Sequence, residues 1–160
     1  MSELVDDAKV LSSSLGVEFS EEEARILARH MEAVTLEDGA QLVKEGEQNR
    51  DLCLLADGEL VVFNMEGDER RIAYTMKPGE CAGTRAFIDG EPRKATLLSV
   101  GQSTVYTITP ETFDALVESH PRLVYKVMRA MFRTVHTNLM RKNFESEELS
   151  HYITKTHGRY

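Results

Sequence analysis

The sequence has few of the residues that mark fibrous, disulfide-rich or disordered proteins. Among its 160 residues are two cysteines, four prolines and no tryptophan, whereas 41% are hydrophobic and 29% are charged. This composition excludes a collagen-like chain, a disulfide scaffold and an intrinsically disordered segment. It predicts a single globular domain with an ordinary hydrophobic core.

Long apolar runs are also missing. No segment approaches the roughly 20 apolar residues that a membrane-spanning helix requires, and the chain starts MSELVDD, with acids where a secretory signal needs a basic region. We therefore expect a cytoplasmic protein with no membrane-bound part. Cys53 and Cys81 lie far apart in the sequence without a CxxC motif, so we expect buried, reduced thiols and no metal or redox pair.

Net positive charge is absent as well. The formal net charge is −8, which disfavours a nucleic-acid-binding domain because such domains gain affinity from cationic contacts to phosphate. The charge is uneven, however: residues 1–60 hold 15 acidic and 5 basic side chains, whereas residues 120–160 hold 3 acidic and 8 basic ones. An acidic first part thus precedes a basic last part.

The chain begins with a helical region. Ser20 is followed by three glutamates, Glu21–Glu23, a pattern typical of a capped helix start with acids in the first turn. It predicts a helix from Ser20 to about Val34. Residues 1–19 form an N-terminal extension, in which a run of three serines weakens a further short helix.

The middle region, residues 34–109, has the pattern of short strands. Apolar or alternating runs are separated by turns that contain glycine, as in antiparallel barrels and sandwiches. The predicted strands span residues 41–44, 52–55, 59–63, 71–76, 95–100 and 104–108. We therefore expect a mainly β fold flanked by helices.

The third region, residues 110–144, is helical again. Thr109 and the proline after it mark a helix start, and Pro121 opens a long helix whose apolar residues cover more than one face. A heptad-like spacing within this helix predicts a dimer seam formed by Val124, Met128, Met131 and Val135. Residues 145–160 are expected to form a C-terminal tail.

The stretch between the fourth and fifth predicted strands, residues 78–96, carries the candidate site. It contains a turn, Gly83, one helical turn, a second loop and Arg93. Backbone N–H groups at a helix start and an arginine opposite them can together bind a phosphate or a carboxylate. An anion pocket is one interpretation. The other is a surface loop in which Arg93 pairs with Glu91 or Asp89.

This stretch, which starts with Pro78-Gly79 and is preceded by glycine-marked turns at Gly46 and Gly58, resembles the phosphate-binding cassette of the cyclic-nucleotide-binding domain. That domain occurs in catabolite-activator-type regulators, kinase regulatory subunits and nucleotide-gated channels. The resemblance covers about residues 20–144. It implies an antiparallel, jelly-roll-like β-roll over residues 34–109, with an N-terminal helix and a long C-terminal helix.

The resemblance also implies roles for individual residues. Arg93 corresponds to the arginine that holds the cyclic phosphate. Thr84 stands where the family has a glutamate for the ribose 2′-hydroxyl, and its neutral hydroxyl forms a weaker hydrogen bond than a carboxylate does. Two further cations, Arg85 and Lys94, lie close by. The expected ligand-binding residues are Gly83, Thr84, Arg85, Ala86, Arg93, Lys94 and Ala95.

Three uses of such a pocket stay open. It takes cyclic AMP or cyclic GMP, weakly or with altered preference; it takes a ligand that carries more negative charge; or it is empty, and the fold is a ligand-free protein-interaction module. Asn138 on the long helix falls near the place where the family contacts the purine. The alternative is that Asn138 lies in the dimer seam and fixes its register.

The family resemblance and the heptad spacing together favour a homodimer through the long C-terminal helix. DNA-binding regulators of the family continue with a helix-turn-helix module, for which the 16 residues after Phe144 are too few. We therefore expect no nucleic-acid contact and an unidentified effector protein as partner. Four cations of the helix are expected to pair with acids, or else to dock an acidic partner: Arg122, Lys126, Arg129 and Arg133.

Catalysis is not expected. A cupin-type metalloenzyme, the main alternative from another class, needs metal ligands on its strands. The five histidines all lie outside the predicted strands, at His30, His120, His136, His151 and His157. An iron–sulfur centre needs four cysteine ligands, and the chain has two cysteines. We therefore expect no metal, no catalytic residue and no cofactor beyond a nucleotide ligand.

Overall fold

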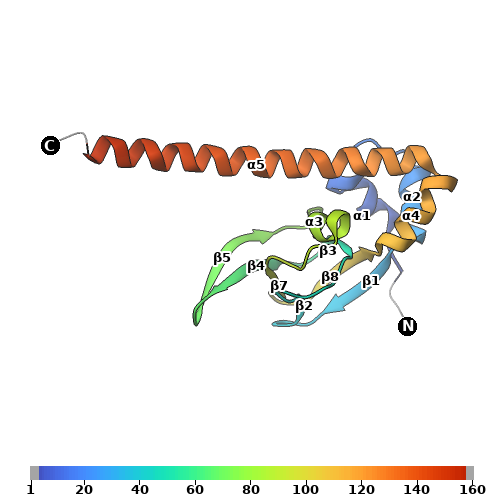
Figure 1. The fold of residues 1–160 in the computed structure, drawn as a ribbon. Coiled ribbons are helices and arrows are strands. Elements are labelled where there is room, and N and C mark those ends of the chain that lie inside the picture. The colour runs from blue at the N-terminus through green and yellow to red at the C-terminus, as the bar shows by residue number, and fades with distance from the viewer. Residues whose placement is uncertain (1–3, 158–160) are drawn as a thin grey trace.

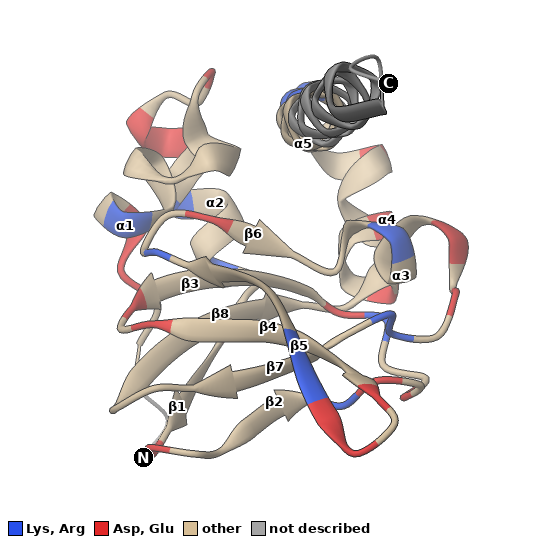
Figure 2. Ribbon diagram, turned by 90° about the vertical axis from the view of Figure 1, so that its left-hand side faces the viewer, with Lys and Arg blue, Asp and Glu red and all other residues tan. Residues whose placement is uncertain are grey.

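The computed structural model describes the backbone of residues 4–157 and the side chains of residues 4–138 and 140. Two antiparallel sheets form a β-roll, and the long C-terminal helix lies across one end of it (Figure 1). Figure 2, turned by 90°, shows the same helix nearly end-on above the roll. The mainly β fold with flanking helices that the sequence predicts is confirmed.

Each sheet contains four strands. In spatial order, the first consists of β1 (Glu32–Leu36), β8 (Ser103–Ile108), β3 (Leu52–Asp57) and β6 (Cys81–Ala82). The second consists of β2 (Gln41–Val43), β7 (Thr96–Ser99), β4 (Leu60–Glu66) and β5 (Glu69–Met76). All six predicted strands are present, whereas β1 and β6 were not predicted.

The helices lie together on one side of the roll (Figure 1 and Figure 2). They are α1 (Asp7–Ser12), the 3-10 turn η1 (Ser14–Gly16), α2 (Glu21–Arg29), α3 (Thr84–Asp89), α4 (Pro110–Ser119) and α5 (Pro121–His157). The predicted capping box is present: Glu23 N donates to Ser20 Oγ over 3.2 Å, and Ser20 N donates to Glu23 Oε1 over 2.9 Å. These bonds satisfy two backbone amides that a helix start otherwise leaves unpaired.

Two helix boundaries differ from the prediction. The helix that starts after Ser20 ends at Arg29 rather than near Val34, because residues 32–36 pair with β8 as a strand. The long helix does not end near Phe144 but continues to His157, through most of the expected tail. No helix among the described residues is long and apolar enough to cross a bilayer.

Strand β3 separates two hydrophobic cores. Leu52 and Leu54 face the helices, whereas Cys53 and Leu55 face the interior of the roll. Alternate side chains of a strand point to opposite faces, so a strand buried on both faces has a continuous apolar sequence. The two cysteines are free and buried, one in each core, with Cys81 on the helix side. The expectation of reduced, buried thiols is therefore confirmed.

The first half of α5 belongs to the helix-side core. Met131 is only 2% exposed there, and Val124 packs against the same core. Two of the four predicted seam residues are thus used inside the chain. The other two, Met128 and Val135, are exposed together with Tyr125 and Phe132 of the same half of the helix.

Ion pairs attach α5 to the N-terminal helical region. Lys126 Nζ lies 2.6 Å from Glu23, and Glu18 accepts from both Arg129, at 2.9 Å, and Arg133, at 3.0 Å. Three of the four cations that the sequence analysis named on this helix therefore pair with acids of their own chain, as predicted.

Candidate functional site

A cavity of about 710 Å³ lies between the second sheet, α3 and α5. The residues expected to bind a ligand all line it: Gly83, Thr84, Arg85, Ala86, Arg93, Lys94 and Ala95. Tyr74 of β5 and Asn138 of α5 contribute to its walls. Segments separated by more than 40 residues in the sequence thus meet at one pocket.

Gly83 starts α3 in a conformation that suits glycine. Its φ is +88°, in the left-handed region. A Cβ atom at this position would collide with Nη1 of Arg93 and would lie 2.9 Å from the carbonyl oxygen of Asp51. The missing side chain therefore lets the guanidinium group of Arg93 pack directly against the backbone of α3.

Arg93 is the main cation of the pocket and is only 6% exposed. Its Nη2 donates to Asn49 Oδ1 over 2.8 Å and to the carbonyl oxygen of Asp51 over 2.6 Å. Its Nε is buried without a hydrogen-bond partner. No carboxylate within the described part of the chain forms an ion pair with Arg93. A buried positive charge of this kind favours a bound anion.

The backbone of Arg93 is held by the loop between β2 and β3. Its N–H donates to the carbonyl oxygen of Glu47 over 2.9 Å, and its carbonyl oxygen accepts from Gly46 N over 2.8 Å. Glu45 N donates to Thr96 Oγ1 over 3.0 Å just beyond. The loop therefore fixes the base of the side chain as well as its tip.

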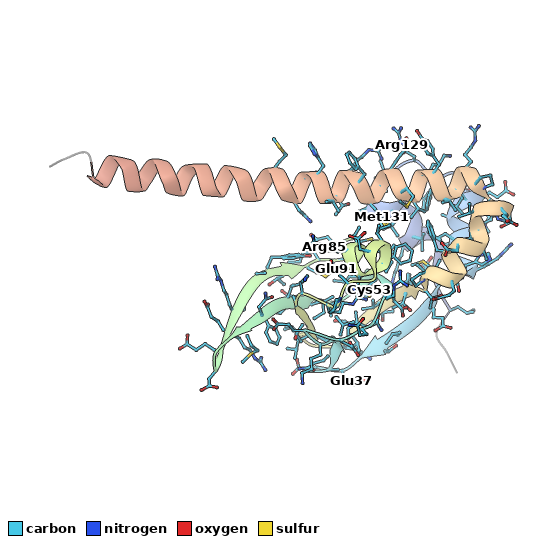
Figure 3. All side chains as sticks on the ribbon, in the orientation of Figure 1. Glu37, Cys53, Arg85, Glu91, Arg129 and Met131 are labelled. Carbon is cyan, nitrogen blue, oxygen red and sulfur yellow. The ribbon has the colours of Figure 1, made fainter. Side chains whose placement is uncertain are left out.

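The alternative in which Arg93 forms a surface ion pair is not observed. Glu91 pairs with Lys94 instead, over 3.2 Å, and both side chains are exposed. Arg85 is also exposed at the pocket wall, and no described carboxylate pairs with it. Figure 3 shows Arg85 and Glu91 beneath α5. Of the two additional cations, Lys94 has a counter-charge in Glu91, whereas Arg85 has none among the described side chains.

Thr84 and Asn138 supply neutral polar groups. Thr84 is half-buried in the first turn of α3, and Asn138 is exposed on the part of α5 that lines the pocket. Asn138 lies on the pocket wall, as its interpretation as a base contact requires. Its amide can both donate and accept hydrogen bonds.

The sequence interpretation missed the residues that hold Arg93 in place. Asn49 and Asp51 lie more than 40 positions before it and belong to no motif that we identified. Burial raises the pKa of the Asp51 carboxyl group, although the nearby Arg93 opposes this shift. Burial also raises the pKa of Cys53 to about 11 and that of Cys81 to about 12, so both thiols stay protonated at neutral pH.

Known proteins resemble this chain in sequence and in fold. A cAMP-dependent protein kinase regulatory subunit from Mucor circinelloides f. lusitanicus is 26% identical over 91 residues, which is 57% of this chain and 21% of the relative. The crystal structure of a cyclic nucleotide-binding domain from Methylobacillus flagellatus KT superimposes with a TM-score of 0.79 at 22% identity, covering 88% of this chain and 81% of that one.

The Thermus thermophilus catabolite activator protein has the same fold, with a TM-score of 0.77 at 22% identity over 86% of this chain and 63% of that one. The matched part of this chain spans only about a fifth of the length of the kinase regulatory subunit from Mucor. The family model described as the cyclic nucleotide-binding domain matches residues 33–120, which include all but the first residue of the β-roll and the whole cassette. This chain therefore belongs to the cyclic nucleotide-binding domain family.

Proposed function

We propose that the pocket binds the phosphate of a cyclic nucleotide, cyclic AMP or cyclic GMP, and that the protein acts as a regulatory module rather than as an enzyme. The observation that carries the proposal is the buried guanidinium group of Arg93, which has no carboxylate partner within the described part of the chain and leaves Nε unpaired. Hydrogen bonds between an ionised donor and a phosphate are about twice as strong as neutral ones.

The groups around Arg93 also suit a nucleotide. Thr84 can accept a hydrogen bond from a sugar hydroxyl, and Asn138 can pair with the edge of a base. Because Thr84 is neutral, we expect a weaker grip on the 2′-hydroxyl than a carboxylate provides. The relative from Mucor, whose name states dependence on cAMP, makes this nucleotide the first ligand to test.

A second candidate is a ligand with more than one negative charge. It is supported by Arg85, an exposed cation at the pocket wall with no carboxylate partner among the described side chains. Binding that depends steeply on salt concentration and on Arg85 would favour this ligand over a cyclic monophosphate.

The proposal assigns no catalytic residue and no metal. The polar residues that line the cavity are three cations, one carboxylate, two threonines, one amide and one tyrosine hydroxyl, besides a thiol whose pKa is raised by burial. A hydrolase or metalloenzyme needs an activated nucleophile or a set of metal ligands. We therefore propose that the site binds its ligand reversibly and does not convert it chemically.

We further propose that the module forms a homodimer along α5 and passes its signal to an effector protein rather than to nucleic acid. Tyr125, Met128, Phe132 and Val135 recur at steps of three and four residues, and Phe132 is 71% exposed. This spacing is that of a coiled-coil seam. Val135 also lines the pocket, so ligand binding and partner contact would meet at the same side chain. The net charge of −8 supports a protein partner.

The dimer is tested by sedimentation equilibrium of the wild type and of the Phe132→Glu variant. We expect a dimer for the wild type and a monomer for the variant, because a buried carboxylate in an apolar seam is costly. An exposed control, Glu118→Gln on α4, should leave the mass unchanged. A monomeric wild type at high protein concentration would contradict the proposed dimer.

The ligand is tested by thermal denaturation with cyclic AMP and with cyclic GMP. A nucleotide present at 100 times its dissociation constant should stabilise the protein by about 2.7 kcal/mol. Arg93→Met should abolish the shift, whereas Lys94→Ala should retain it. No shift with either nucleotide would favour the ligand-free interaction module.

A further inference from the structure

Asn49 shares a hydrogen-bond network with Arg93 and has no counterpart in the cassette motif. Its Oδ1 accepts from Arg93 Nη2 over 2.8 Å, although the two residues lie 44 positions apart in the sequence. We propose that Asn49 is a positioning residue: it orients the guanidinium group of Arg93 toward the pocket without neutralising its charge. This inference rests on the proposed binding of an anion at Arg93.

The orientation of the Asn49 amide is fixed by a second bond. Asp51 N donates to the same Oδ1 atom over 2.9 Å. A backbone N–H needs an acceptor, so the oxygen of the amide and not its nitrogen must face this point. The acceptor for Arg93 is therefore in place before any ligand binds.

The nitrogens of the Arg93 guanidinium group differ in their hydrogen bonds. Nη2 donates both of its hydrogens, to Asn49 and to the backbone of Asp51. Nε remains buried and unpaired, and Nη1 lies against Gly83. The protein thus anchors one nitrogen and leaves another as a hydrogen-bond donor for an anion.

Both acceptors of Arg93, the Asn49 amide and the backbone carbonyl of Asp51, are uncharged. A carboxylate in place of Asn49 would accept the same two hydrogen bonds but would form an ion pair with Arg93. Its negative charge would then oppose a phosphate bound to the same guanidinium group. An amide orients the arginine equally well and leaves its charge available to the ligand.

The isosteric variant Asn49→Asp separates this role from a purely structural one. If Asn49 only supports the loop, aspartate should replace it without loss, because Asp51 N and Arg93 Nη2 retain their acceptor. If Asn49 orients Arg93 without adding a counter-charge, Asn49→Asp should weaken ligand binding about tenfold or more. Asn49→Ala should weaken binding to a similar extent, because the guanidinium group loses an anchor.

The matched control is Gln48→Glu, the same change from amide to acid at the preceding position. Gln48 lies in the same loop and is exposed. Calorimetric titration with cyclic AMP and cyclic GMP should give a Gln48→Glu affinity within about twofold of the wild type. Wild-type affinity in Asn49→Asp would overturn the proposal, as would equal losses in Asn49→Asp and Gln48→Glu.

A measurement without ligand distinguishes failure of this inference from failure of the proposed function. Nitrogen-15 NMR of the ligand-free protein follows the exchange of the Arg93 Nε–H proton with water. We expect slow exchange in the wild type and at least tenfold faster exchange in Asn49→Ala. If the wild type binds neither nucleotide, the proposed function fails. Unchanged exchange in Asn49→Ala would then overturn the positioning role on its own evidence.

Discussion

Arg93 in the pocket and three basic side chains of α5 have opposite surroundings. Arg93 is buried in the pocket and has no carboxylate partner among the described residues. Lys126, Arg129 and Arg133 on α5 lie closer to solvent, and each forms an ion pair with a glutamate of the N-terminal helical region. Figure 3 labels Arg129 on the long helix, away from the pocket residue Arg85.

Under the proposed function, this difference separates a cation that binds ligand from cations that hold the structure together. Exposed ion pairs contribute little to stability because water screens both charges, so the pairs on α5 mainly fix the helix against its own chain. A buried cation held only by neutral acceptors costs free energy. A bound anion would recover that cost, and removal of each kind of cation should therefore have a different consequence.

The largest expected effect comes from the buried cation. Arg93→Met should weaken nucleotide binding at least about 100-fold, since it removes charge-assisted hydrogen bonds to phosphate. Without ligand, the unfolding free energy of this variant should fall by less than about 1 kcal/mol, or should rise, because a buried charge without a counter-charge is removed. Calorimetry and urea denaturation measure the two quantities. Equal binding loss in Arg129→Ala would remove the distinction between the two regions.

A backbone change beneath the same cation should have the next largest effect. Gly83→Ala places a Cβ in a left-handed conformation and against Nη1 of Arg93. We expect a loss of about 2 kcal/mol in unfolding free energy together with weaker binding, as the guanidinium group must move. Gly39→Ala, also at positive φ but with open space around it, is the control for backbone strain alone. Equal effects of both variants on binding would argue against the close contact at Gly83.

The ion pairs of α5 predict a smaller, pH-dependent effect. Burial alone would raise the pKa of Glu23, but hydrogen bonds from Lys126 and Ser20 outweigh it and hold the pKa below its ordinary value of 4.5. The charged pair therefore stabilises the protein fully above pH 4.5, and this contribution is lost as the pH falls through the lower folded-state pKa.

Glu23→Gln retains the capping box and removes only the charge. Relative to the wild type we expect a loss of about 0.5–1 kcal/mol at pH 7, which disappears as the pH falls well below 4.5. Urea denaturation at a series of pH values measures it. A difference that does not depend on pH would mean that the amide disturbs packing rather than charge.

The smallest effect is expected for the exposed cation beside the pocket. Lys94 forms an ion pair with Glu91 over 3.2 Å, and both side chains are exposed to solvent. Lys94→Ala should change nucleotide affinity by no more than about threefold, because the charge is screened and partly compensated. Arg85→Ala, which removes a cation without a described carboxylate partner, is the matched comparison. A loss at Lys94 as large as at Arg93 would show that proximity to the pocket matters more than burial.

Local signals in the sequence were sufficient for most of the fold. The capping residues at Ser20 and Thr109 and the glycine-separated apolar runs predicted the helix starts and six strands, all of which are present. The two-residue strand β6 escaped because it is too short for a periodic pattern. Strand β1 escaped because its residues followed a helix without a breaker, and only pairing with β8 selects the extended conformation.

The candidate site was predicted in part. The cassette residues were found because they are consecutive and resemble a known motif, and they do line one cavity. Asn49 was not found, because its relation to Arg93 exists only after the β2–β3 loop folds over the cassette. The predicted seam on α5 is not available in full for a similar reason: Met131 is taken into the core of its own chain.

The sequence alone determined a mainly β domain with a long C-terminal helix, because turns, caps and alternation are local properties of the chain. The resemblance to the family's cassette, and not these local patterns, marked Arg93 as the candidate phosphate-binding residue. Tertiary structure alone decided which charges remain unpaired. Arg93 is buried against Gly83 and neutral acceptors, whereas Lys126 and Arg129 of α5 meet glutamates more than 100 residues earlier. Burial and ion pairing depend on which distant segments pack together, and packing decides which cation is available to a ligand.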